Sequence, residues 1–228
     1  MTKPNASLAQ IAIDSPAAPG VFLRHGLDFC CHGQRSLAEA CNEKGLDPQA
    51  IIGELETAAA PQGVAARLKD RPLAEIVDFI VETYHAPLRR DLPGIIDLAA
   101  KVERVHADKP TCPRGLASHL GDVLAGVESH MAKEEQILFP LIRAGRGAMA
   151  LMPIKVMMAE HEDHGEGLRL TRELTGDLVP PPEACTSWRA LYAELGRLEA
   201  ELMEHIHLEN NILFPRALNG DGAVGQRA

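Results

Sequence analysis

An eleven-residue pattern occurs twice in the chain. The stretch HMAKEEQILFP covers residues 130–140, and HIHLENNILFP covers residues 205–215, which is 75 positions later (205 − 130). In both copies a histidine precedes a glutamate by four residues, and the letters ILFP follow. Because residues four apart lie on one face of an α-helix, each copy predicts a helix that presents a histidine and a glutamate together.

Two further histidines follow the same repeat. His85 lies in VETYHAPL and His161 lies in MMAEHEDH, 76 positions later (161 − 85). The chain therefore contains two copies of one helix pair, in which the first helix carries a histidine and the second carries a histidine and a glutamate. Each half would supply half of a symmetric site.

The repeated side chains predict a metal site. Four imidazoles and two carboxylates in a dry core need a bound cation, because burying charge without compensation is costly. The set suits two divalent ions bridged by the two glutamates, and its mixture of nitrogen and oxygen favours non-haem iron, with manganese or zinc as alternatives. A single H-x-x-x-E pair is usually an exposed helix pair, but two such pairs in phase indicate a shared site. The predicted ligands are His85, His130, Glu134, His161, His205 and Glu209.

Four other histidines are not among the predicted ligands. His207 lies two positions after a predicted ligand, so it should point away from the metal-facing side of its helix. His106 and His119 have no partner in the repeat. His164 lies one turn beyond a predicted ligand and could lie near the site, so its role stays open.

Composition and periodicity favour an all-α chain. Aromatic residues make up only 4% of the 228 residues, and apolar residues recur at helical spacing. Prolines and glycines separate four long helical segments, which predict an antiparallel four-helix bundle. These segments cover residues 73–104, 113–143, 149–175 and 183–217.

A smaller helical domain is expected before the bundle. Ser36 with Glu39 predicts a capping box, and Asp47 before Pro48 predicts an N-cap followed by proline at the first helical position. The predicted linker is AAAPQGVAARLKDRP, residues 58–72. The predicted division is residues 1–62 for a small domain with a Cys-Cys pair, 73–220 for the bundle and 221–228 for a flexible tail.

Charge and cysteine content limit the expected partners and location. The formal net charge is −9 and no block of Lys or Arg occurs, so neither nucleic acid nor an anionic membrane is expected as a partner. No apolar signal segment, no membrane-spanning run and an odd number of cysteines favour the cytoplasm. The oligomeric state is left open between monomer and homodimer. No hydrolase motif occurs, so any reaction would be redox chemistry at a non-haem di-iron centre.

The dipeptide Cys30-Cys31, in the sequence FCCHG, is the second chemical feature. Adjacent Cα atoms are about 3.8 Å apart, which is shorter than ordinary disulfides prefer, so a disulfide here would be strained. As thiols, the pair could hold iron, a cluster fragment or a nitrosyl species, or exchange electrons, and His32 could lower a thiol pKa or act as a ligand. The alternative is two small side chains packed in a core. The remaining cysteines, expected to be packing residues, are Cys41, Cys112 and Cys185.

The sequence resembles a known family over almost the whole chain. The motifs that carry the resemblance are the Cys30-Cys31 pair, KVERVHADKP at 101–110, PPPEACTSW at 180–188 and LENNILFPRAL at 208–218. They are similar to those of the iron–sulfur cluster repair di-iron proteins, the RIC (repair of iron centres) family, also called YtfE or ScdA, to which NorA and DnrN are related. The resemblance implies a haemerythrin-like bundle preceded by a small N-terminal domain.

The resemblance also implies a ligand set and a function. The family's metal ligands fall on the same six residues that the repeat selects, with Glu134 and Glu209 bridging two irons. Family members are cytoplasmic stress proteins that restore iron–sulfur clusters damaged by nitric oxide or oxidants, with NO or O₂ as small ligands and the pair Cys30 and Cys31 taking part. The alternative function is a haemerythrin-like protein that binds, scavenges or senses NO or O₂.

Two residues depart from the family pattern. The family often has two glycines after the cysteine pair, and His32 replaces the first of them. Pro87 lies two residues after His85 inside an expected helix, where it removes a backbone donor and should kink or loosen that turn. The turn that carries His85 is therefore expected to be irregular.

Overall fold

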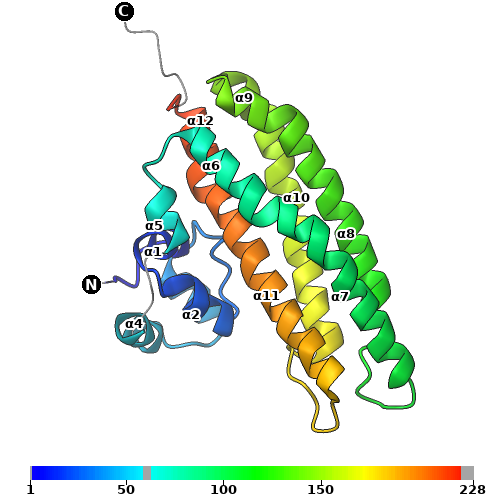
Figure 1. Ribbon diagram of the computed structural model, residues 1–228. Coiled ribbons are helices and arrows are strands. Elements are labelled where there is room, and N and C mark those ends of the chain that lie inside the picture. The colour runs from blue at the N-terminus through cyan, green and yellow to red at the C-terminus, as the bar shows by residue number, and fades with distance from the viewer. Residues whose placement is uncertain (1, 59–62, 222–228) are drawn as a thin grey trace, which may run out of the picture. The chain divides into compact units, whose positions relative to one another are not determined.

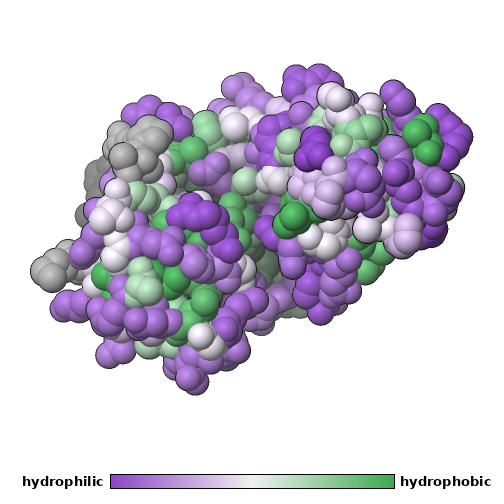
Figure 2. Space-filling view, turned by 90° about the horizontal axis from the view of Figure 1, so that it is seen from below, coloured by the Kyte–Doolittle hydropathy of each residue, from purple (hydrophilic) through white to green (hydrophobic). Residues whose placement is uncertain are grey.

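The computed structural model describes residues 2–58 and 63–221, and it is all-α over those ranges, as predicted (Figure 1). The β-type pairing in these ranges is an isolated bridge between Ser7 and Ser36. No helix in the described part of the chain is long and apolar enough to cross a membrane. Figure 2 shows a face on which hydrophilic residues predominate, with small groups of hydrophobic residues between them. The predicted tail, apart from Asp221, lies outside the described residues.

The chain divides into two compact units. The first comprises the chain up to Val77, the segment Leu141–Leu151 and the residues from Met203 onward. The second comprises Asp78–Pro140 and Met152–Leu202. The second unit therefore holds most of the four long helical segments, and the first holds the N-terminal helices with the remaining ends of the long segments. The domain boundaries at residues 62 and 73 stay a prediction.

Short helices occupy the N-terminal segment. They are α1 Leu8–Asp14, α2 Ala18–Arg24, α3 Leu37–Glu43, α4 Pro48–Thr57 and α5 Val64–Leu68. Ser36 and Glu39 form the predicted capping box of α3, because Ser36 Oγ accepts from the Glu39 N–H (3.2 Å) and Glu39 Oε2 accepts from the Ser36 N–H (2.9 Å). Asp47 caps α4 through the N–H of Gln49 at 2.9 Å, with Pro48 at the first helical position as predicted.

The N-terminal helices enclose an apolar core. Phe22, Phe29 and Leu37 are fully buried in it. Burying a side chain of this size contributes about 1.5–3 kcal/mol, so the loops between these short helices have a core to hold them in place. Helix α5 lies inside the predicted linker 58–72 and buries Ala65, so part of that stretch is helical. Residues 59–62 lie outside the described part of the chain.

Four long helical segments follow, as predicted. They are α6–η1–α7 (Leu73–Ile80, Val81–His85, Ala86–Val105), α8–η2–α9 (Leu116–Lys133, Glu134–Leu138, Phe139–Arg143), α10 (Gly147–Thr175) and α11–η3–α12 (Thr186–Leu208, Glu209–Leu213, Phe214–Leu218), where η denotes a π-helical turn. The predicted segments agree with these bounds to within three residues at each end. Proline and glycine positions were therefore sufficient to place the helices of the bundle.

In the second unit, α7, α8, α10 and α11 run side by side as a bundle (Figure 1). Buried residues recur every three or four positions, which is the helical period that keeps one face inward. On α7 they are Leu88, Leu92, Ile95, Ala99 and Val102. On α11 they include Trp188, Leu191, Leu195, Leu198 and Leu202. Histidines and glutamates buried in such a bundle need a specific partner.

Each π-helical turn ends two residues before a proline. The turns Val81–His85, Glu134–Leu138 and Glu209–Leu213 precede Pro87, Pro140 and Pro215. Proline has no N–H to donate and its ring clashes with the carbonyl four residues earlier, and a wider turn relieves that clash. Pro93 lies inside α7 without such a turn, so proline alone does not produce one. The turn that carries His85 is irregular, as expected, because it is the π-helical turn η1. The helix is not interrupted at Pro87, since α7 continues to Val105.

Candidate metal centre

The second unit brings four of the predicted ligands together. Oε2 of Glu134 lies 3.4 Å from Nε2 of His85 and 3.4 Å from Nε2 of His130. Nε2 of His130 lies 3.1 Å from Nε2 of His161. All four side chains are at most 2% exposed. Residues from η1, α8, η2 and α10 thus present nitrogen and oxygen ligand atoms to one another in a buried space.

The other two predicted ligands lie at the junction of α11 and η3. Nε2 of His205 is 3.1 Å from Oε1 of Glu209, so the four-residue spacing places both side chains on one helix face. Both are buried. Glu209 begins a π-helical turn, and Glu134 also begins one. The two copies of the sequence repeat therefore share an unusual backbone form at the glutamate.

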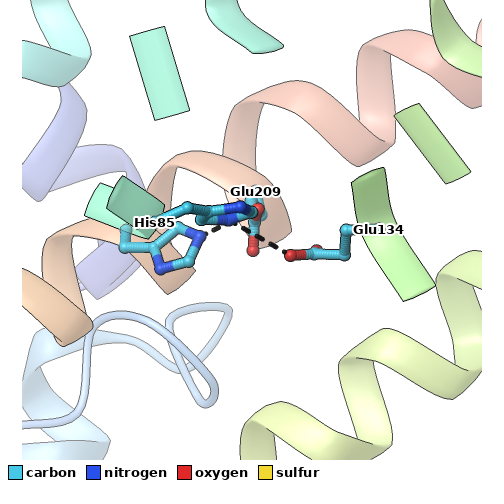
Figure 3. A group of neighbouring side chains, drawn as sticks. His85, Glu134 and Glu209 are labelled. Carbon is cyan, nitrogen blue, oxygen red and sulfur yellow. Dashed lines mark hydrogen bonds and ion pairs between the residues drawn. The ribbon is translucent and has the colours of Figure 1, made fainter. Parts of the chain in front are cut away.

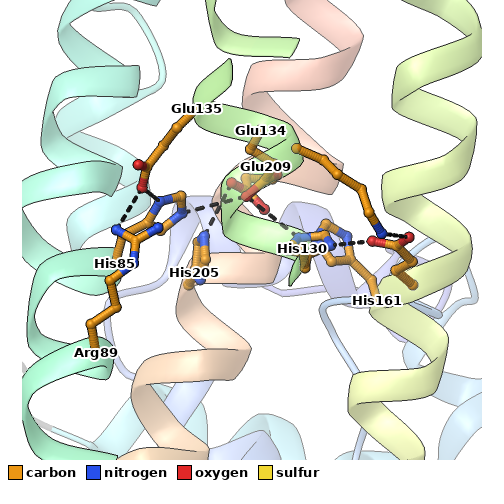
Figure 4. A network of polar contacts seen from close by, with 10 residues as sticks. His85, Arg89, His130, Glu134, Glu135, His161, His205 and Glu209 are labelled. Carbon is orange, nitrogen blue, oxygen red and sulfur yellow. Dashed lines mark hydrogen bonds and ion pairs between the residues drawn. The ribbon is translucent and has the colours of Figure 1, made fainter. Parts of the chain in front are cut away.

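The structure gathers the six predicted ligands into two sets that share both glutamates. One set is His85, Glu134, His205 and Glu209, and the other is His130, Glu134, His161 and Glu209. Within each set, one ligand atom per residue lies within 4.8 Å of the others. Figure 3 shows His85, Glu134 and Glu209 pointing toward one another, and Figure 4 shows the histidines around the two carboxylates. This arrangement fits two ions bridged by the glutamates.

The donor atoms fit bound cations. The Glu134 side chain is fully buried, and its oxygens accept no hydrogen bond within the described residues. A buried charge without compensation is strongly destabilising. A nitrogen–oxygen separation of 3.4 Å suits two atoms that bind one ion at about 2.1 Å. Imidazole with carboxylate is typical of non-haem iron, so the two sets fit a di-iron centre.

A carboxylate outside the ligand sets orients His85. Nδ1 of His85 donates to Oε1 of Glu135 at 2.7 Å. The ring proton therefore lies on Nδ1, and the lone pair lies on Nε2, which faces Glu134. Burial raises the pKa of Glu135, but hydrogen bonds from Arg89 (2.8 Å) and His85 outweigh burial, and the net pKa lies below its ordinary value. The His85 ring also stacks on Phe139 of the ILFP motif.

A second carboxylate orients His130 in the same way. Nδ1 of His130 donates to Oε2 of Glu160 at 2.9 Å, and Lys133 donates to the other oxygen of Glu160. Burial raises the pKa of Glu160, but the hydrogen bonds from Lys133 and His130 outweigh it, so the net pKa is lowered. Each of these two ligand histidines thus donates to a carboxylate that also accepts from a cationic side chain. Figure 4 labels Glu135 and Arg89 beside His85.

The two supporting carboxylates do not follow the sequence repeat. The residue that corresponds to Glu135 in the second copy is Asn210, and the residue that corresponds to Glu160 before the other histidine is Tyr84. The repeat therefore does not predict these two carboxylates. The sequence feature that could have identified them is their position, because Glu135 and Glu160 are each adjacent in sequence to a predicted ligand.

His207 lies outside both sets, as predicted. It is 1% exposed, and its Nδ1 donates to the carbonyl oxygen of Phe29 at 3.3 Å. Burial lowers the pKa of His207 to about 4, although the hydrogen bond to Phe29 opposes this shift. His207 is therefore a neutral buried residue that contacts the segment with the cysteine pair.

The other histidines contact groups outside the two sets. His119 contacts the carbonyl oxygen of Gly167 through Nε2 at 2.9 Å. The His164 ring lies 4.9 Å from the His130 ring, edge to face, and lines a cavity of about 370 Å³ beside α8 and α10. His106 contacts the thiol of Cys185 at 3.2 Å. None of the three belongs to either ligand set.

The neighbouring cysteines are thiols that lie beside Asp28. The two sulfur atoms are 3.6 Å apart and form no disulfide. The hydrogen bond with Cys31, burial and the nearby Asp28 carboxylate raise the pKa of Cys30 well above its usual value. Nδ1 of His32 donates to Oδ2 of Asp28 at 2.7 Å. Burial raises the pKa of Asp28, but hydrogen bonds from His32 and the cysteines outweigh it, so the net pKa is lowered.

The remaining cysteines differ in exposure. Cys41 and Cys112 are buried, which suits packing residues. Cys185 is exposed, so the expectation that it is a packing residue is wrong. Cys185 directly precedes α11, at the end of a proline-rich loop, and its neighbours there do not enclose its side chain.

The fold and the site together define a haemerythrin-like, cation-binding protein. The family model of the hemerythrin HHE cation binding domain matches residues 77–217. The model ScdA_N, a domain of unknown function, matches residues 4–59. The two matches correspond to the bundle and to the N-terminal helices that precede it.

The chain belongs to the family of the iron–sulfur cluster repair protein YtfE, as its motifs indicated. It is 46% identical over 217 residues to that protein of Yersinia pseudotuberculosis serotype O:1b (strain IP 31758), which covers 95% of this chain and 98% of the relative. It is 48% identical over 214 residues to the protein of Citrobacter koseri, with 94% and 97% coverage. The similarity therefore includes both the N-terminal helices and the bundle.

Proposed function

We propose that this protein repairs iron–sulfur clusters damaged by nitrosative or oxidative stress, by delivering iron or removing NO at a non-haem di-iron centre. The observation that carries the proposal is the pair of buried ligand sets that share Glu134 and Glu209. The relatives in Yersinia and Citrobacter are named iron–sulfur cluster repair proteins, and the similarity covers nearly their whole length. Its partners are damaged iron–sulfur proteins.

In this proposal, the six predicted ligands hold the two irons, which supply redox chemistry and affinity for small diatomic ligands. They are His85, His130, Glu134, His161, His205 and Glu209. Each set offers two imidazoles and the two shared carboxylates, which leaves coordination positions for NO or O₂. Glu135 and Glu160 hold the rings of their histidines with the lone pair on Nε2.

Cys30 and Cys31 take part in the repair as thiols. Their sulfur atoms are 3.6 Å apart, and Cys31 is partly exposed, so the thiol of Cys31 is accessible to a partner. None of the five cysteines forms a disulfide, which suits a cytoplasmic location. The protein acts there as a monomer or homodimer.

The test is iron-dependent reactivation of a [4Fe–4S] dehydratase whose cluster has been damaged by NO. The wild type should bind about two irons per chain and reactivate the dehydratase. Glu134→Ala and Glu209→Ala should each lose both iron and reactivation, because each removes a shared ligand. Glu166→Ala is the matched control, since Glu166 is an exposed residue of α10 that pairs with Arg169. Retention of full iron by the Glu134 and Glu209 variants would refute the proposed ligand set.

A second variant tests the thiols separately. Cys30→Ala combined with Cys31→Ala should leave the bundle iron intact and lower the rate of reactivation. Full reactivation by this variant would remove the thiols from the proposal. A fall of iron content by half would place part of the iron in the N-terminal segment.

A further inference from the structure

The loop that follows α2 gathers three metal-binding side chains outside the bundle. One ligand atom each from Asp28, Cys30 and Cys31 lies within 4.8 Å of the others. Oδ1 of Asp28 is 3.3 Å from Sγ of Cys30, and the two sulfur atoms are 3.6 Å apart. All three residues belong to the first compact unit, and none is part of the two histidine–glutamate sets.

These distances match the edges of a coordination tetrahedron. Two thiolates bound to one ion at about 2.3 Å lie about 3.8 Å apart at the tetrahedral angle, and a thiolate and a carboxylate oxygen lie about 3.5 Å apart. The observed values are 3.6 Å and 3.3 Å. A disulfide would need the sulfur atoms at about 2.05 Å. The side chains are thus close enough to share one ion, and the sulfur atoms are too far apart for a disulfide.

The loop is held in this form by the end of α11 and by η3. Asn210 and Asn211 donate to the carbonyl oxygen of Cys30, each at 3.2 Å. His207 donates to the carbonyl oxygen of Phe29, whose side chain is fully buried. Because the backbone is fixed by these contacts, binding an ion does not require the loop to be ordered first.

The loop also leaves one side of the group open to solvent. Cys30 is 4% exposed, whereas Cys31 is half-buried. The side chain of Asp28 is 33% exposed. His32 donates to Oδ2 of Asp28 at 2.7 Å and so directs Oδ1 toward the thiols. An ion can therefore enter from the side of Asp28 and Cys31.

We propose that Asp28, Cys30 and Cys31 form a second metal site, which binds one thiophilic divalent cation such as Zn²⁺ or Fe²⁺ and keeps a fourth coordination position open. On binding, the two thiols release two protons to solvent and both sulfur atoms bond to the ion as thiolates. His32 positions the carboxylate. The inference goes beyond cluster repair, since it requires neither repair activity nor iron in the bundle.

The competing explanation is that Asp28 only caps the loop. Its Oδ1 accepts from the N–H groups of Cys30 (3.0 Å) and Cys31 (2.9 Å), and this alone would stabilise the turn. Asp28→Asn separates the two explanations, because an amide oxygen can keep both hydrogen bonds while the negative charge is lost.

The experiment is a titration of the reduced, metal-free, full-length protein with Co²⁺. Thiolate-to-cobalt charge transfer absorbs in the near ultraviolet, and the bundle ligands contain no sulfur, so this band reports the cysteine site alone. The band should saturate at one ion per chain. It should disappear in Cys31→Ser and appear with at least about tenfold weaker affinity in Asp28→Asn. Cys185→Ser should leave it unchanged, because Cys185 is exposed and lies outside the proposed site.

A measurement on the wild type removes any dependence on folding of the variants. Bound Co²⁺ should protect Cys30 and Cys31 from alkylation, as read by mass spectrometry of the two residues, while Cys185 stays reactive. The proposal is overturned by the absence of the charge-transfer band, by a band that persists in Cys31→Ser, or by equal affinity in Asp28→Asn. Alkylation of the pair at the same rate with and without Co²⁺ would overturn it too.

Discussion

At the scale of single residues, carboxylates outside the ligand sets determine which ring nitrogen of a ligand histidine carries the proton. Glu160 accepts from Nδ1 of His130 at 2.9 Å. Glu160→Gln removes the charge that favours this tautomer, so the iron affinity should fall about 10–100-fold. Competition against a coloured ferrous chelator measures this change. Glu166→Gln, an exposed change on the same helix, should have no effect, and equal affinities in both variants would mean that other contacts orient His130.

His207 is a residue whose role is structural although it lies between two predicted ligands. It bonds to the carbonyl oxygen of Phe29, and its ring packs edge-to-face on the Phe29 ring, with centroids 5.3 Å apart. His207→Ala should lower the free energy of unfolding by about 2–3 kcal/mol, through the lost hydrogen bond and ring contact and a new cavity. Urea unfolding with an iron assay on the same sample measures both properties.

The iron content should not change in this variant, because His207 belongs to neither ligand set. His25→Ala is the matched control, since His25 pairs with Glu54 near the surface and its loss should cost less than about 1 kcal/mol. Loss of iron from His207→Ala without loss of stability would contradict the structural role.

At the scale of elements, two of the π-helical turns, η2 and η3, end within the ILFP motif, two residues before its proline. Leu138 and Phe139 of its first copy are buried, and Pro140 is exposed. Pro140→Ala restores a backbone donor without changing the core, so η2 should relax toward α-helix and move the Glu134 carboxylate. The metal-free protein should become more stable, because proline is about 3 kcal/mol worse than alanine within a helix, while the iron affinity should fall about tenfold.

Pro93→Ala is the control for this change, because Pro93 is exposed and lies in α7 without a π-helical turn. It should gain stability and keep its iron affinity. Affinity titrations and urea unfolding of both variants give the comparison. Unchanged affinity in Pro140→Ala would show that core packing alone maintains the turn at Glu134.

The same elements explain what the sequence could predict and what it could not. The long helices were predictable because proline and glycine mark their ends, and the six ligand candidates were predictable because a duplicated pattern keeps them in phase. The π-helical turns were not, since Pro93 shows that proline has this effect only in some surroundings. Glu135 and Glu160 were missed because they differ between the two halves, and only tertiary contacts bring each to its histidine.

At the scale of the whole molecule, one short segment contributes residues to the histidine–glutamate sets and also to the contacts that hold the cysteine loop. In the sequence HIHLENN, His205 and Glu209 belong to the histidine–glutamate sets. His207, Asn210 and Asn211 instead bond to the carbonyl oxygens of the cysteine loop. A change in the backbone of this segment would therefore move the ligands His205 and Glu209 and also the side chains that bond to the cysteine loop.

Iron should consequently stabilise the entire fold. Glu134 and Glu209 are fully buried, and a buried charge without a compensating partner is strongly destabilising. A ligand that binds only the native state at a free concentration 100 times its Kd adds about 2.7 kcal/mol, which for 228 residues raises Tm by about 5–10 °C. Anaerobic calorimetry of metal-free and iron-loaded protein measures the shift. The shift should be smaller in Glu134→Ala than in the wild type, and an absence of any shift in the wild type would contradict iron binding at these six residues.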